Sequence, residues 1–147
     1  MEFQKLTGLC PAIIKTLSVA VAVGGLMTAD LAVAESDHPT EHKGLTVEQL
    51  AVVPAESMAL QINLEGHVLL ARRITIEPGG QIAMHSHESI PGIVFMESGE
   101  WTEGRADGET VHVAGDAFIE DIETTHWFYN RSDYPATALV FDIRPPG

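Results

Sequence analysis

From residue 58 onward the sequence alternates between apolar and polar residues, and this feature constrains the fold most. In MALQINLEGHVLL the apolar residues Leu60, Ile62 and Leu64 alternate with polar residues up to Gly66. Such alternation is typical of a half-buried β-strand, because successive side chains point to opposite faces. Further short apolar segments end at Gly, Pro, Asn or Asp, as strands joined by tight turns do. These segments are VLLARRITIEPGG, GIVFMESGEW, ETVHVAGD, AFIED, HWFYN and ATALVFDIRP.

Six or more short strands without a long amphipathic helix predict an all-β sandwich or barrel. The chain has 147 residues, the size of one ordinary domain. A closed barrel also leaves few unpaired strand edges. We therefore expect a single β-barrel domain over residues 58–147, in which the strand after Gly66 ends at the turn Pro78-Gly79-Gly80.

Residues 1–34 have the plan of a secretory signal peptide. The N-terminal region, MEFQKLTGLCPAIIK, carries Lys5 and Lys15. It is followed by the short apolar run TLSVAVAVGGLM and by small residues that lead to a cleavage position after Ala34. The run is short for a transmembrane helix, but an anchored N-terminal helix remains the alternative. We expect export to the periplasm or the medium, without membrane association after cleavage. The remaining chain has no cysteine, so its stability must come from its core.

Residues 35–57 are expected to form a flexible arm. The stretch ESDHPTEHKG is polar and has no apolar periodicity, so His38 and His42 are assigned to a solvated tail. The next stretch, LTVEQLAVVPAES, is either a short turn of helix or an extended segment before Pro54. The formal net charge of -13 argues against nucleic acid as a partner.

Three histidines form a candidate metal site. His85 and His87 are two residues apart, so on a strand both point to the same face. His126 lies in a late aromatic segment, and three neutral imidazoles meeting from distant strands suit Fe, Zn, Ni or Cu. The structural alternatives are a polar surface face or a satisfied buried pair for His85 and His87, and a core histidine bonded to backbone for His126.

The spacing of these histidines resembles the two motifs of the cupin superfamily. In the first motif, Gly79 is followed after five residues by His85-Ser86-His87, and Gly92 and Gly99 follow at the family's spacing. In the second motif, Gly115, His126 and Asn130 lie at the family's positions. The resemblance covers about residues 58–143 and implies a double-stranded β-helix, also called a jelly-roll barrel. It also implies that Asn130 ties backbone segments together.

The sequence departs from the family pattern at two places. Gly92 replaces the usual metal-binding glutamate, and Asp121-Ile122-Glu123 replaces the Pro-x-Gly of the second motif. The resemblance then implies a site of three histidines with open coordination positions, similar to the three-histidine iron sites of thiol dioxygenases, with Gly92 and Val94 lining the pocket. Glu88 and Glu97 are expected to face away from it. Whether Glu120 or Glu123 replaces the missing carboxylate is left open.

The remaining aromatic residues and histidines receive simpler assignments. Trp101, Trp127 and Phe128 are expected in the core or along a pocket. His67 and His112 have no partner by spacing and are treated as ordinary residues.

These features predict an exported cupin metalloprotein, with dioxygenase-like oxidation of a small molecule as the leading chemistry. The cofactor is a divalent transition metal, with iron leading and Zn, Mn, Ni and Cu as alternatives. The alternative function is a non-catalytic cupin module that binds or senses a small molecule or a metal. A structural barrel without metal ranks last, and a homodimer through sheet edges is a further expectation.

Overall fold

The computed structural model describes residues 37–147, so the predicted signal peptide lies outside the described residues. Most of the described chain lies in β-strands, which confirms the all-β class. The elements are β1 (Lys43–Val53), α1 (Ala55–Ile62), β2 (Val68–Ser86), β3 (Gly92–Ser98), β4 (Glu100–Arg105), β5 (Gly108–Val113), β6 (Ala117–Glu120), β7 (Thr125–Tyr129) and β8 (Ala136–Arg144).

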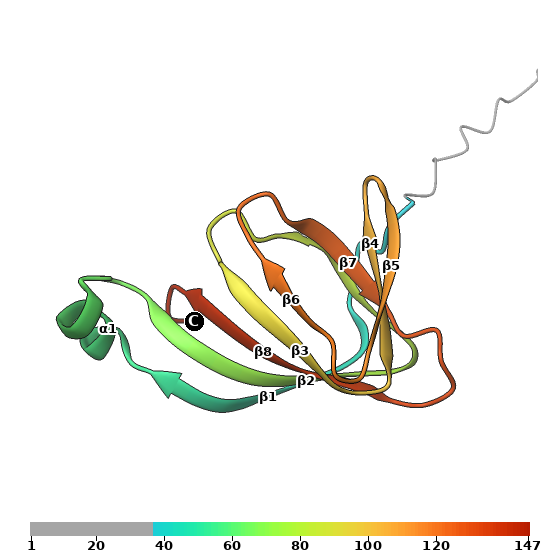
Figure 1. Ribbon diagram of the computed structural model, residues 1–147, viewed down its shortest axis with the longest axis horizontal. Coiled ribbons are helices and arrows are strands. Elements are labelled where there is room, and N and C mark those ends of the chain that lie inside the picture. Colours follow the sequence, from blue (N-terminus) through green and yellow to red (C-terminus); the bar gives the residue numbers. More distant parts are fainter. Residues whose placement is uncertain (1–36) are drawn as a thin grey trace, which may run out of the picture. The chain divides into compact units, whose positions relative to one another are not determined.

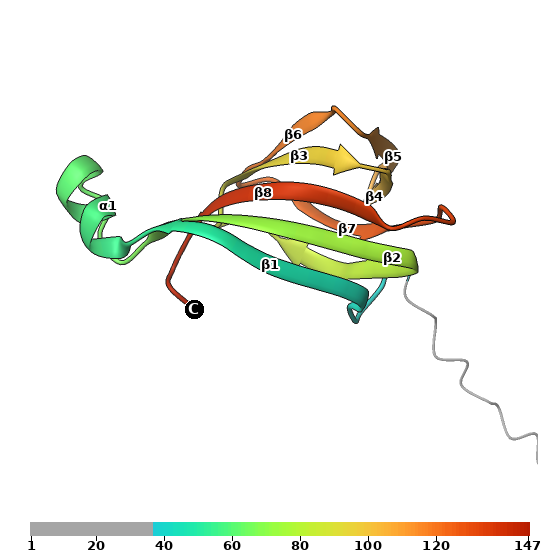
Figure 2. The ribbon, with the colours of Figure 1, turned by 90° about the horizontal axis from the view of Figure 1, so that it is seen from below.

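The strands form one antiparallel sheet that curls on itself. Its order is β5-β4-β7-β2-β8-β3-β6, and β1 pairs with β2 outside this path. In Figures 1 and 2 the sheet bends so that β3 and β6 stand across from β1 and β2. Neighbouring strands in the order are often far apart in sequence, which brings the two histidine segments together. The curled sheet agrees with the expected β-barrel.

The core lies inside the curl and follows the alternation of the strands. On β8, Ala136, Ala138 and Val140 are buried, whereas Phe141 on the opposite face is 40% exposed. Trp101 and Phe128 are each 1% exposed and belong to the same apolar cluster. Alternation therefore determines which side chains enter the barrel and which face solvent.

Strand β2 continues through the predicted turn at Pro78-Gly79-Gly80. It has 19 residues, and the turn residues form a bulge at which the pairing to β1 shifts register. A Cβ at Gly80 would lie 2.7 Å from the carbonyl oxygen of Glu77 and 2.8 Å from that of Lys43. Glycine thus allows the close backbone approach that a bulge needs, and the strand bends instead of ending.

The segment 35–57 was expected to be flexible, and this is wrong for its larger part. Residues of β1 pair with β2 from Lys43↔Gln81 to Val53↔Leu69. The segment before β1 also contacts the barrel, since the Ala83 amide donates to His42 Nδ1 at 3.1 Å. The ring of His38 lies 5.4 Å from that of Trp127. The compact unit accordingly begins near residue 34, not at residue 58.

The first predicted strand is a helix. Residues Ala55–Ile62 form α1, which follows Pro54 and ends at Asn63 in the left-handed conformation. Leu60 and Ile62, whose alternation suggested a strand, are 78% and 58% exposed. Ala, Glu, Met, Leu and Gln favour a helix, and no neighbouring strand is available to pair here. No described helix is long and apolar enough to cross a membrane.

Candidate metal centre

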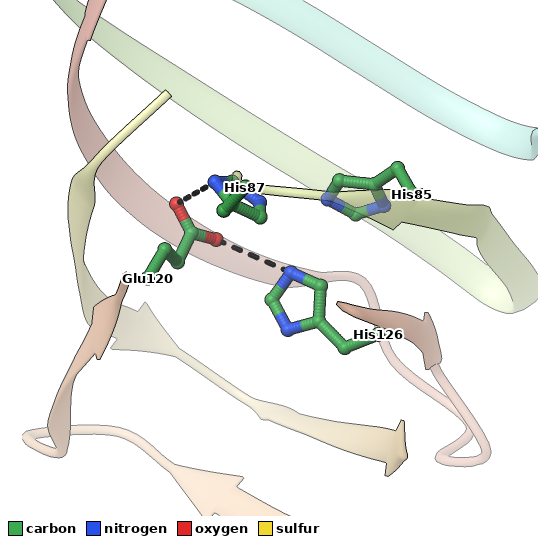
Figure 3. Close-up of side chains that lie close together, drawn as sticks. All are labelled: His85, His87, Glu120 and His126. Atoms are coloured by element: carbon green, nitrogen blue, oxygen red, sulfur yellow. Dashed lines mark ion pairs between the residues drawn. The ribbon is translucent and has the colours of Figure 1, made fainter. Parts of the chain in front are cut away.

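Four side chains from three strands converge inside the barrel. His85 lies near the end of β2 and His87 directly after it, His126 is on β7, and Glu120 is the last residue of β6. His85 and His126 are directly paired across the β2–β7 ladder. One potential ligand atom from each of the four residues lies within 4.8 Å of all the others. Figure 3 shows the three imidazoles and the carboxylate facing a common centre.

Hydrogen bonds orient each imidazole through its Nδ1 atom. Nδ1–H of His85 donates to the carbonyl of Ala83 at 2.9 Å, and that of His87 to the carbonyl of Ile90 at 2.8 Å. Nδ1–H of His126 donates to Glu103 Oε1 at 2.7 Å. These acceptors fix the tautomer, because a carbonyl or carboxylate cannot donate. In each ring the Nε2 lone pair is thereby left as the free donor for a metal ion.

Burial keeps the imidazoles of His85 and His87 neutral at physiological pH. It lowers the pKa of His85 to about 4, although the hydrogen bond to Ala83 opposes the shift. Burial also lowers the pKa of His87. A neutral imidazole is the form that binds a metal, so both rings are ready to act as ligands near pH 7.

Glu120 supplies the carboxylate that the sequence motif lacks. It is 5% exposed, with Oε1 3.6 Å from His126 Nε2 and Oε2 3.5 Å from His87 Nδ1. Burial, reinforced by the nearby charge of Asp142, raises its pKa to about 7. A buried carboxylate facing imidazoles is stabilised by a cation placed among them. Glu123, the other candidate, is exposed on the turn after β6.

The roles assigned to Gly92 and Val94 need correction. Gly92 pairs with Glu120 across β3 and β6, and a Cβ at Gly92 would lie 2.6 Å from Glu120 Oε2. The glycine therefore makes room for a carboxylate from the next strand instead of leaving a position open. Val94 is fully buried in the core. The three-histidine site is accordingly a cluster of three histidines and one glutamate.

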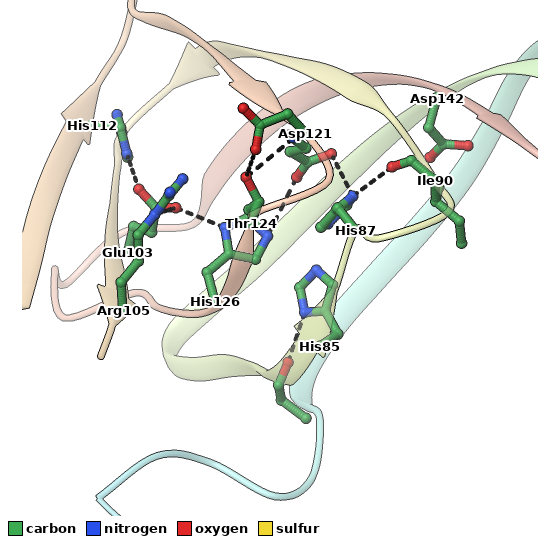
Figure 4. Close-up of polar contacts among 12 residues, drawn as sticks. His85, His87, Ile90, Glu103, Arg105, His112, Asp121, Thr124, His126 and Asp142 are labelled. Atoms are coloured by element: carbon green, nitrogen blue, oxygen red, sulfur yellow. Dashed lines mark hydrogen bonds and ion pairs between the residues drawn. The ribbon is translucent and has the colours of Figure 1, made fainter. Parts of the chain in front are cut away.

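A second layer of polar residues supports His126. Oε1 of Glu103, on β4, accepts a hydrogen bond from His126. The other carboxylate oxygen, Oε2, lies 2.9 Å from Nε2 of His112. Arg105 also donates to Glu103 at 2.7 Å. Burial opposes ionisation of Glu103, but these three hydrogen bonds outweigh it and lower its pKa to about 2. Figure 4 shows this series of hydrogen bonds. Because His112 helps to hold Glu103, it supports the site and is not the ordinary residue that the sequence suggested.

Sequence reasoning missed Glu103 and left Glu120 undecided. Both lie on segments where they share a strand face with apolar neighbours: Glu120 with Phe118, and Glu103 with Trp101. A charged residue in phase with the apolar face of a strand signals a buried, partnered charge. That signal was present in AFIED and in EWTEGR, but the partners came from other strands.

Asn130 and Trp127 hold the strands around the site. The Asn130 side-chain amide donates to the carbonyls of Ile76 at 2.8 Å and Tyr134 at 2.7 Å, as the family resemblance implied. Trp127 packs over Gly104, where a Cβ would come within 2.2 Å of the indole nitrogen. In both cases a side chain of the β7 segment contacts the backbone of a neighbouring segment, and these contacts hold β7 beside β2 and β4.

A cavity of about 470 Å³ opens beside the four side chains. Leu45 and Val47 of β1 contribute to its lining together with the core residues Ile74, Trp101 and Phe128. The polar part of the wall includes His85, His87, Glu120, Arg72 and Arg144. The cavity can admit a small organic molecule to the side chains of the cluster.

The donor set fits a divalent transition metal ion. Three imidazole nitrogens and one carboxylate oxygen are ligands that first-row metals accept. Nε2 of His87, Nε2 of His126 and Oε2 of Glu120 are buried without a hydrogen-bond partner. Buried polar atoms in folded proteins are nearly always satisfied, and one bound cation would satisfy all three of these.

Comparison with known proteins supports the fold. Residues 72–142 match the family model described as the cupin domain. The cupin domain of an XRE-family transcriptional regulator from Enterobacter cloacae is 15% identical, with a TM-score of 0.53 over 71% of this chain and 100% of that one. A predicted oxalate decarboxylase from Thermotoga maritima is 22% identical, with a TM-score of 0.53 over 74% and 94% of the two chains.

An oxalate oxidase in complex with glycolate is also similar. It is 22% identical, with a TM-score of 0.50 over 69% of this chain and 55% of that one. Curated protein sequences give no significant match. At these identities the structures establish the fold, and the family match agrees with it in the segment that carries the site. The chain therefore contains a cupin domain, at residues 72–142.

Proposed function

We propose that this protein is a metalloenzyme that binds a divalent transition metal through His85, His87, Glu120 and His126. Its substrate would be a small organic molecule in the adjoining cavity. One observation carries the proposal: four ligand atoms lie within 4.8 Å of one another, and three of the four residues present buried atoms without a hydrogen-bond partner. Leaving such atoms unsatisfied is costly, and a bound cation removes the cost.

Iron is the leading metal, with Mn, Zn, Ni and Cu as alternatives. Imidazole suits Fe, Ni, Cu and Zn, and a carboxylate extends the set toward Mn. When bound, such an ion supplies Lewis acidity, and iron or manganese also supplies a redox couple. The protein holds the ligands in place through Glu103, Ala83 and Ile90, and the apolar cavity wall excludes water around the substrate.

Oxidation is the reaction class that we favour. Structures of the same fold include one described as an oxalate oxidase and one described as a predicted oxalate decarboxylase. The alternative is a module that binds a small molecule without turnover. The reason for it was the apparent loss of the carboxylate ligand at Gly92. Because Glu120 supplies a carboxylate, that reason is removed and the enzyme is favoured.

Elemental analysis tests the metal site. Wild-type protein exposed to Fe²⁺ and then dialysed should retain about one metal ion per chain, and His126→Ala should retain far less. His67→Ala is the matched control, because His67 lies before β2 and outside the four-residue cluster. Circular dichroism checks that each variant is folded. Equal metal content in wild type and His126→Ala would refute the site.

Oxygen uptake tests the reaction class. The iron-loaded enzyme should consume oxygen when a small acid, thiol or phenol is added, and the metal-free protein should not. Binding of such molecules without oxygen uptake, at equal strength with and without metal, would instead favour the binding module.

A further inference from the structure

The cavity has a positive lining in an acidic protein. The chain carries a formal net charge of -13, yet the described residues that line the cavity include two arginines, Arg72 and Arg144, against one carboxylate, Glu120. Cavities that concentrate one sign of charge select ligands of the opposite sign. The two guanidinium groups are therefore the places in this lining where an anion can bind, even though the protein as a whole repels anions.

Arg72 is held at the cavity wall by a buried carboxylate. It alternates with Arg73 on β2, so Arg72 points into the barrel and Arg73 points out. Its guanidinium donates to Asp142 on the adjacent strand β8, whose side chain is fully buried. A guanidinium fixed in this way keeps N–H groups for a ligand, because it has five donors in a rigid plane.

Arg144 is the arginine of the described residues that forms no ion pair. The other four arginines of the described chain each form an ion pair with a carboxylate, whereas Arg144 has no such pair among described residues. It lies two residues after Asp142 on β8, so both side chains are on the strand face that enters the barrel. Arg72 and Arg144 thus present two guanidinium groups along one side of the cavity.

Much of the remaining wall is apolar. Ile74, Ile82, Trp101, Phe128 and Val140 also line the cavity. An inorganic anion would leave this surface unoccupied. An organic acid with an apolar body would bury it, and burial of apolar surface contributes roughly 25 cal/mol per Å².

We propose that the cavity binds a small organic carboxylate, with its carboxylate held by Arg144 and Arg72 and its apolar body against the core residues. This names the substrate class for the proposed function and rests on the same cavity. The ligand then lies in the cavity that His85, His87 and Glu120 also line. Arg144 acts as a specificity residue, because it selects acids over neutral molecules of the same shape.

Calorimetry with a matched pair of probes tests the proposal in metal-free protein. Hexanoate and hexanamide have nearly the same shape, but only hexanoate is charged. Hexanoate should bind about tenfold or more tightly than hexanamide, because a charge-assisted hydrogen bond contributes about 1.5–3 kcal/mol. The preference should weaken at high salt. Equal affinities, or no binding of either probe in the millimolar range, would overturn the proposal.

Arg144→Gln should abolish most of the preference for the acid, and Arg144→Lys should restore part of it. Arg73→Gln is the matched control: it removes the same charge from the outer face, where Arg73 pairs with Glu48 and Glu97. Arg144 is chosen over Arg72, because loss of Arg72 would leave Asp142 buried without its partner. An equal loss in Arg73→Gln and Arg144→Gln would also refute the proposal.

The two proposals can fail separately. The anion test uses metal-free protein and the arginines, whereas the test of the proposed function uses metal content and His126. Acid binding without metal retention would leave the ligand class intact and reject the metalloenzyme. Metal retention without preference for the acid would do the reverse.

Discussion

Glu120 is a residue whose position favours metal binding and disfavours the metal-free fold. Burial raises its pKa to about 7, above the ordinary value of 4.5. A carboxyl group whose pKa is raised in the folded state stabilises the protein below its unfolded pKa, and this contribution is lost as the pH rises through the folded pKa. The free energy of unfolding of the metal-free protein should therefore fall as the pH rises from about 4.5 to about 7. A bound cation should compensate the charge of Glu120 and remove this loss.

We predict that Glu120→Gln stabilises the metal-free protein at pH 8. A shift from 4.5 to about 7 corresponds to roughly 3 kcal/mol at most, since one pKa unit equals about 1.4 kcal/mol. Near pH 4 the two proteins should differ little. Glu120 is then protonated in the folded protein and in most of the unfolded molecules. Urea unfolding in the presence of a chelator, repeated from pH 4 to pH 8, measures the difference.

The same series separates Glu120 from the histidines. Burial lowers the pKa of His85 to about 4, so its contribution is present above the unfolded pKa of 6.5 and is lost as the pH falls toward 4. Wild type and Glu120→Gln share that trend, and it cancels in their difference. Glu123→Gln, which changes an exposed carboxylate, is the control. A difference between wild type and Glu120→Gln that does not change with pH would contradict the assigned pKa.

At the scale of elements, three adjacent strands decide where the carboxylate comes from. Gly92 on β3 pairs with Glu120 on β6 at one side and with Asp142 on β8 at the other. The family motif places the glutamate at the position of Gly92, but here the neighbouring strand delivers it. Gly92 does not have a positive φ, so steric space and not backbone conformation is what requires glycine.

We predict that the carboxylate can be moved back to β3. Gly92→Glu alone should destabilise the protein by about 2 kcal/mol, because its Cβ would approach Glu120 Oε2 to 2.6 Å. Glu120→Ala alone should lose metal, and the double variant Gly92→Glu/Glu120→Ala should recover both metal and stability. Denaturant unfolding and metal analysis of the four proteins form a double-mutant cycle.

The control for the swap is Ile93→Glu combined with Glu120→Ala. Ile93 is the next residue on β3 and is 53% exposed on the outer face. Ile93→Glu therefore adds the same charge outside the barrel. Recovery of metal in this control, or its absence in the Gly92→Glu double variant, would show that position 92 does not face the metal-binding cluster.

The elements also show which predictions from sequence were reliable. Alternation correctly indicated the β-class and the inward face of β8, because local patterning records burial there. It failed at α1, where Leu60 and Ile62 alternate yet lie exposed on a helix. The stretch before Pro54 was left open between a helical turn and an extended segment; it is the extended strand β1, whose pairing with β2 no local pattern records.

At the scale of the whole molecule, the site depends on the register of the sheet. The family spacing selected the three histidines, and the β2–β7 ladder brings His85 opposite His126. Glu103 and Glu120 could not be placed from sequence alone, because their roles depend on which strands lie beside β4 and β6. Metal ligands and their supporting residues thus follow from long-range pairing, whereas the β-class follows from local pattern.

The described fold is a unit that we predict to be independent of residues 1–34. Every described strand lies between Lys43 and Arg144. A chain of residues 35–147 should therefore fold, retain metal and show the same unfolding transition as the full chain. Circular dichroism, metal analysis and denaturant titration compare the two forms. Failure of the shorter chain to fold would show that the leading segment belongs to the domain.

Export is proposed on the same boundary. If residues 1–34 are a signal peptide, protein recovered from the periplasm or the medium should begin at Glu35, next to the start of the compact unit. Intact mass and N-terminal sequencing of that fraction give the position directly. Ala34→Leu is the informative variant, because a large residue at the cleavage position should block processing while the folded domain is left unchanged. Full-length protein retained with the cells for both wild type and variant would reject the signal peptide and favour an N-terminal anchor.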